Sequence, residues 1–92
     1  MKRRVGFHVT GRVQGVAYRA SARDQAGALG VQGWIRNTDA GAVEGEVEGE
    51  ASAVDAFLAW CKKGPPGARV DRLAVSDAEL AEPASGRFEI RR

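Results

Sequence analysis

The residues best suited to chemistry in this chain lie between positions 11 and 19, in the run GRVQGVAYR, which joins a strand-like segment to a helix-like one. Successive backbone N–H groups of such a loop can converge on an anion, and the helix N-terminus behind them adds about half a positive charge. Arg19 falls on the first helical turn, where its guanidinium can offer fixed donors to two phosphate oxygens at once. The run therefore predicts a phosphate site. The residues expected to bind the substrate are Gln14, Gly15, Val16, Ala17, Tyr18 and Arg19.

Several kinds of phosphate chemistry are excluded by the residue types near this loop. No cysteine begins a C-x5-R loop, no G-x4-G-K-[ST] motif is present, and the chain has a single histidine and a single cysteine. Without a compact group of acids and bases, the site must act on a bond that is already labile. Acyl phosphates qualify because their carboxylate leaving group needs no proton, whereas an alkyl ester would need a general acid worth about 10² to 10⁴ in rate.

The remaining requirement is a water molecule held in line with the P–O bond. A neutral carboxamide can orient such a water by accepting and donating hydrogen bonds. Asn37 is the candidate, although its position before the turn residues 38–41, taken alone, favours a purely structural role.

Two motifs in order resemble the acylphosphatase family. Residues 11–19 resemble the signature G-x-V-Q-G-V-x-[FY]-R, and the resemblance continues through residues 29–37, LGVQGWIRN, and 39–45. Beyond Gly49 only element lengths and turn residues agree. The resemblance implies hydrolysis of acyl phosphates without metal or cofactor, with Arg19 as the phosphate-binding catalytic arginine and Asn37 as the water-orienting asparagine. Tyr18 stands where the family often has phenylalanine, and it is expected to pack beneath the loop.

The hydrophobic pattern predicts seven elements. Period-two alternation around residues 5–9 and 43–48 indicates strands, and spacing at i, i+3, i+4 and i+7 from Val54 to Cys61 indicates an amphipathic helix for which Ser52 is a plausible N-cap. A first helix is expected from about Tyr18 to Leu29, ended by Gly30. Further strands are expected at Val31–Asn37, Val70–Val75 and Phe88–Arg91, with a polar stretch Ser76–Gly86 between the last two.

This order, βαββαβ with an extra C-terminal strand, predicts the α+β class and a ferredoxin-like α/β sandwich in which two helices cover one face of an antiparallel sheet. Ninety-two residues make one domain, residues 1–92. On the uncovered face, Glu44, Glu46 and Glu48 are expected to be solvated, opposite Arg4 and His8 in exposed pairs worth a few tenths of a kcal/mol each.

The net charge, the length of apolar runs and the cysteine count limit the partners and the cellular compartment that we expect. The formal net charge is +2, and no apolar run is long enough to span a bilayer or to serve as a signal peptide, so a cytoplasmic protein without membrane contact is expected. The single cysteine, Cys61, fits a reducing compartment and falls in register with core residues. The expected partner is a small-molecule acyl phosphate, bound by a monomer.

Two alternatives remain open at this point. One is a non-catalytic domain that binds phosphate or acyl phosphate for regulation. The other is an RNA-binding module of the same fold, which the glutamates of the third strand disfavour because a polyanion needs aromatic and basic residues there.

Overall fold

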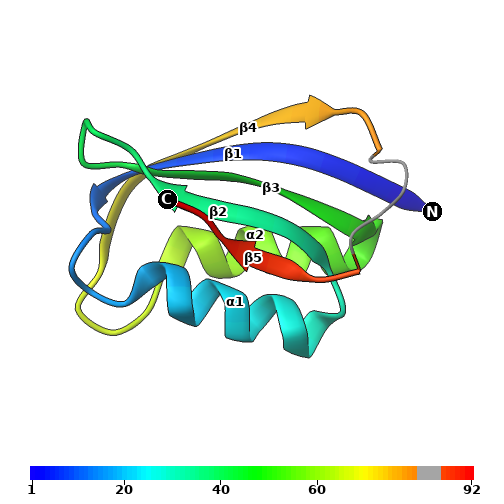
Figure 1. Ribbon diagram of the computed structural model, residues 1–92, viewed down its shortest axis with the longest axis horizontal. Helices are drawn as coiled ribbons and strands as arrows, with labels where there is room; N and C mark the ends of the chain where they lie inside the picture. The colour runs from blue at the N-terminus through cyan, green and yellow to red at the C-terminus, as the bar shows by residue number, and fades with distance from the viewer. Residues whose placement is uncertain (81–85) are drawn as a thin grey trace.

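The computed structural model describes residues 1–80 and 86–92, and its elements follow the predicted order (Figure 1). The first helix has the predicted bounds, and Gly30 after it takes a left-handed conformation, φ 71°, as expected of a helix-ending glycine. The elements are β1 (Lys2–Arg12), α1 (Tyr18–Leu29), β2 (Gln32–Asn37), β3 (Val43–Glu50), α2 (Ala51–Lys63), β4 (Arg69–Ala78) and β5 (Phe88–Ile90).

The sheet has the strand order β4-β1-β3-β2-β5, and the three pairs among β1 to β4 are antiparallel as predicted. The prediction of a fully antiparallel sheet is wrong for β5, which pairs parallel with β2, Ile35 lying opposite Ile90. The direction of β5 follows from the place where β4 ends. Because β4 ends at the same end of the sheet at which β2 begins, a final strand that starts there must run in the direction of β2 (Figure 1).

Both helices cover one face of the sheet, which is the predicted ferredoxin-like arrangement (Figure 1). Val5, Phe7 and Val9 of β1 are buried on that face. Phe7 meets Phe57 of α2 edge to face, with ring centroids 5.7 Å apart. The period-two and helical patterns of the sequence thus meet in one core.

Two predicted boundaries are wrong by two residues or more. Ser52 is not the N-cap of α2, because the chain passes directly from β3 into the helix and Glu50 takes the cap position without a side-chain cap hydrogen bond. The fourth strand continues three residues past Val75 to Ala78, because Ser76, Asp77 and Ala78 still pair with β1. The predicted polar stretch Ser76–Gly86 therefore begins inside β4, and part of it, residues 81–85, lies outside the described residues.

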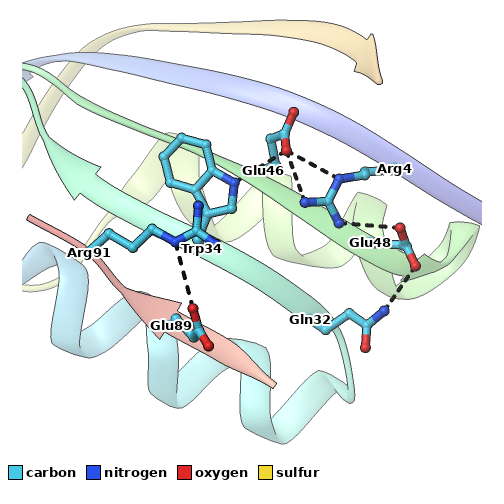
Figure 2. A network of polar contacts seen from close by, with 7 residues as sticks. All are labelled: Arg4, Gln32, Trp34, Glu46, Glu48, Glu89 and Arg91. Carbon is cyan, nitrogen blue, oxygen red and sulfur yellow. Dashed lines mark hydrogen bonds and ion pairs between the residues drawn. The ribbon is translucent and has the colours of Figure 1, made fainter. Parts of the chain in front are cut away.

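The uncovered sheet face carries the expected charges, but they are not all solvated. Arg4 on β1 contacts Glu46 at 2.9 Å and Glu48 at 3.2 Å, and the side chains of Arg4 and Glu48 are only 11% and 7% exposed (Figure 2). The expectation of exposed pairs is therefore wrong for this one. Long neighbouring side chains cover it, since Gln32 and Trp34 of β2 donate to Glu48 and Glu46. His8 is exposed, as predicted.

Candidate active site

The predicted site residues come together at one end of the molecule. The loop after β1, the start of α1 and the end of β2 lie side by side there, on the left in Figure 1. They enclose a cavity of about 210 Å³. The residues that line the cavity are Val13, Gln14, Gly15, Ala17, Tyr18, Arg19, Ala20, Asn37 and Ile90.

The loop backbone is shaped for close approach of a ligand. Gly15 has φ 76°, and a side-chain carbon built at this position would meet nothing within 4 Å. Ala17 also has a positive φ, 60°, which is uncommon for a residue with a Cβ and is often found at functional sites. The loop therefore holds an unfavourable backbone conformation at the edge of the cavity.

The first turn of α1 lines the cavity. Ala17 is the N-cap residue, and it has no side chain that could accept a hydrogen bond from the helix N-terminus. The first backbone N–H groups of a helix have no partner within the helix, so an external acceptor is favoured at this position. An anion in the cavity would supply that acceptor.

Arg19 is available to the same ligand. Its side chain is half-buried and lines the cavity. Among residues 1–80 and 86–92, no carboxylate forms an ion pair with it. A guanidinium in this setting can place two parallel N–H donors on a phosphate group.

Asn37 is the last residue of β2, and the turn that follows it is fixed by several hydrogen bonds. Within the turn, the backbone N–H of Thr38 donates to the carbonyl of Ala42 at 2.9 Å, and the N–H of Ala42 donates to Thr38 Oγ1 at 3.0 Å. From outside the turn, Gln14 Nε2 donates to the carbonyls of Thr38 and Ala42, both at 2.9 Å. The loop that carries Gly15 is thus bonded to the turn that follows Asn37.

Tyr18 packs beneath the loop as predicted, and its hydroxyl is accommodated by donating to the backbone carbonyl of Cys61 at 2.8 Å. Burial raises the pKa of the Cys61 thiol to about 12 and raises the pKa of the Tyr18 phenol above its usual value. Neither group is ionised at neutral pH. Cys61 is accordingly a core residue, as the sequence indicated, and not a reactive thiolate.

The cavity includes residues that the sequence did not single out and omits one that it did. Val13, Ala20 and Ile90 line it, whereas Val16 packs against the core instead. Ile90 comes from β5, far from the loop in sequence, and only the parallel pairing with β2 brings it to the cavity. No sequence signal distinguishes Ile90 from an ordinary strand residue.

A larger hollow of about 530 Å³ lies between α1 and the loop after α2, beside Asp24, Trp60 and Lys63. Its charges are of both signs, and it contains none of the predicted site residues. Across the described parts of the chain, no three His, Cys, Asp or Glu side chains are grouped so that they could hold a metal ion. No helix in the same residues is long and apolar enough to cross a membrane.

The chain is similar to several known proteins in sequence and in fold. The family model "Acylphosphatase" matches residues 5–90. A curated acylphosphatase from Anaeromyxobacter dehalogenans is 56% identical over 85 residues, covering 90% of this chain and 88% of that protein. Among solved structures, an acylphosphatase from Coxiella burnetii aligns with TM-score 0.92 and 30% identity over 98% of this chain and 93% of the other. The acylphosphatase from Bacillus subtilis aligns with TM-score 0.91 and 33% identity over 100% of both chains.

Proposed function

The chain belongs to the acylphosphatase family and is an enzyme that hydrolyses acyl phosphates to a carboxylate and inorganic phosphate, and from this premise we propose that Arg19 and the loop amides hold the phosphate while Asn37 orients the attacking water. The observation that carries the proposal is the shared cavity. Arg19 and Asn37 come from separate motifs, 18 positions apart, yet both line one cavity together with Gly15 and the first turn of α1.

Phosphate binding is the role of the loop and of Arg19 in this proposal. The amides at the start of α1 lack a side-chain cap, and the guanidinium of Arg19 has no carboxylate partner among the described residues. Both kinds of donor would meet the non-bridging phosphate oxygens, where negative charge is spread in the transition state. The positive end of the helix adds to the same attraction.

Attack by water is the step assigned to Asn37. Its carboxamide can accept a hydrogen bond from the water and donate another, without itself gaining or losing a proton. The water oxygen forms a bond to phosphorus while the bond from phosphorus to the acyl oxygen breaks, and the carboxylate leaves with the bonding electron pair. The proton lost by the water passes to phosphate or solvent. Because the leaving group is a weak base, the site needs no general acid, and we propose that it needs no metal ion.

The same proposal sets the partners and the location. The substrate is a small molecule, and we propose that the chain acts as a monomer in the cytoplasm, where a lone buried cysteine such as Cys61 stays reduced. Nucleic acid is not a proposed partner, because Glu44, Glu46 and Glu48 on the open sheet face would repel phosphates. A regulatory domain that only binds phosphate would share the cavity but would not release product.

Substitution of Asn37 tests the proposal most directly. We expect purified wild-type protein to release phosphate from acetyl phosphate at the same rate with and without EDTA. Asn37→Ala should lower kcat by about 100-fold or more, while the inhibition constant of inorganic phosphate stays within about twofold. Asp39→Ala, in the exposed turn outside the cavity, is the matched control and should leave both values unchanged.

Three results would contradict parts of this proposal. Loss of activity in EDTA, restored by a divalent cation, would overturn metal independence. Near-normal kcat in Asn37→Ala would return Asn37 to a purely structural role in the turn. Loss of phosphate binding together with activity would instead make Asn37 part of the phosphate site.

A further inference from the structure

We propose that Gln14 is a positioning residue, which holds the water-orienting Asn37 at a fixed place relative to the phosphate loop. The inference rests on the roles proposed above for Arg19 and Asn37. Gln14 itself needs no contact with the reacting atoms. Its part is to join the two segments that carry them.

The hydrogen bonds of Gln14 carry the inference. Both N–H groups of its side-chain amide point to one turn, since Nε2 lies 2.9 Å from the carbonyl oxygen of Thr38 and 2.9 Å from that of Ala42. These two carbonyls stand at the two ends of the turn that follows Asn37. The side-chain oxygen of an amide only accepts hydrogen bonds, so Gln14 has no side-chain donor left for an anion. Any contact of Gln14 with phosphate would therefore come from its backbone.

The position of Gln14 in the chain makes the connection specific. It directly precedes Gly15, whose positive φ shapes the loop, and it lies five residues before Arg19. Thr38, which accepts one of its bonds, directly follows Asn37. A single side chain thus connects the backbone beside Gly15 to the backbone beside Asn37, across 24 positions of sequence.

The consequence for catalysis is geometric. The water must sit in line with the breaking bond, and a displacement of about 1 Å of a positioning group can cost about 100-fold in rate. The internal bonds of the turn hold its shape but not its distance from the loop. We expect that loss of both Gln14 bonds lets the turn move relative to the phosphate, which affects the attacking water more than phosphate binding.

The test uses Gln14→Met, which keeps the length of the side chain and removes both donors. We expect kcat to fall about tenfold or more, while the inhibition constant of inorganic phosphate changes by less than about threefold. The matched control is Gln32→Met. Gln32 also makes two side-chain hydrogen bonds, since it donates to Glu48 (Figure 2) and accepts from the N–H of Gly86. It lies at the opposite end of β2 from Asn37 and does not line the cavity. The Gln32→Met variant should keep the wild-type kcat.

A double-mutant cycle separates positioning from general destabilisation. If Gln14 acts through Asn37, then Gln14→Met should change kcat by less than about twofold when Asn37 is already alanine. Equal effects in both backgrounds would overturn the inference while leaving the role of Asn37 intact. Normal kcat in Asn37→Ala alone would overturn both. If Gln14→Met does not fold, Gln14→Asn, whose shorter amide cannot reach both carbonyls, takes its place with the same expected results.

Discussion

At the scale of single residues, the hydrogen-bond donors around the cavity are of two kinds, those with a partner in the protein and those without a side-chain partner. The hydroxyl of Tyr18 has a partner, because it donates a hydrogen bond to the backbone carbonyl of Cys61 in the core. The side-chain amide of Gln14 likewise donates both its N–H groups to carbonyls of the turn after Asn37. By contrast, the first turn of α1 has no side-chain cap and Arg19 lines the cavity, and in our proposal both donate hydrogen bonds to the substrate phosphate. Buried hydrogen-bond donors need a protein partner in every state of the protein, whereas donors that face a cavity can bind water until a ligand replaces it.

The proposed role of Arg19 can be tested by replacing it with lysine. Arg19→Lys keeps the charge but loses the paired donors, so we expect kcat/KM for acetyl phosphate to fall by roughly 10² to 10³ and inhibition by inorganic phosphate to weaken. Steady-state kinetics with phosphate as a competitive inhibitor measures both. Arg23→Lys, exposed on the same helix, should match the wild type. Unchanged kcat/KM in Arg19→Lys would mean that the arginine does not bind the phosphate through two donors.

At the scale of elements, the open sheet face is held together by side chains that cross between strands. Arg4 of β1 joins Glu46 and Glu48 of β3, and Trp34 of β2 donates to Glu46 (Figure 2). The guanidinium of Arg91 lies 5.0 Å from the ring centroid of Trp34, which ties the end of β5 to β2. These contacts fix the neighbouring strands β2 and β5, which carry Asn37 and Ile90 to the cavity.

The buried pair of Arg4 should matter more for stability than an exposed pair on the same strand. Arg4→Met removes the cation paired with Glu48, whose side chain is 7% exposed, and we expect a loss of about 3 kcal/mol in the free energy of unfolding. Arg3→Met removes an ion pair with Asp55 whose side chains are 37% and 66% exposed, and it should cost less than about 1 kcal/mol. Urea denaturation of both variants measures the difference. Equal losses would show that water and the remaining contacts of Glu48, such as its hydrogen bond from Gln32, compensate for the loss of Arg4.

At the scale of the whole molecule, one core supports both layers. Aromatic rings form its centre, with the Phe57 and Phe88 centroids 5.4 Å apart and those of Tyr18 and Trp60 5.3 Å apart. Tyr18 belongs to both the core and the wall of the cavity. We therefore propose that residues 1–92 fold as a single domain, and that the cavity cannot keep its shape when the helix layer separates from the sheet.

The two tryptophans test this proposal. Trp60 lies in the helix layer beside Tyr18, and Trp34 lies on the open sheet face. Unfolding of Trp34→Phe and of Trp60→Phe, each followed by its remaining tryptophan, should coincide with unfolding followed by circular dichroism in the same variant, as a two-state domain requires. A fluorescence midpoint that differs from the circular dichroism midpoint would show that the two layers unfold separately.

Much of the fold could be predicted because its signals are local. The alternation around Val5, Phe7 and Val9 and the helical spacing from Val54 to Cys61 reflect which face of each element is buried, and the structure confirms both. Gly30 marked the end of the first helix, where the backbone takes a positive φ. The motifs also indicated the family and its activity, which the comparisons confirm. The catalytic roles of Arg19 and Asn37 stay predictions.

What the sequence could not decide depended on contacts between distant segments. Three features are of this kind: the parallel direction of β5, the contribution of Ile90 to the cavity, and the two hydrogen bonds from Gln14 to the turn after Asn37. Each depends on segments that are distant in sequence, so no local pattern encodes it. The burial of Glu48 is of the same kind, because its period-two position indicates the open face, and only the long side chains of neighbouring strands decide whether water reaches it. A residue's own sequence neighbourhood sets which face it occupies, whereas the partners it meets on that face are set by the tertiary structure.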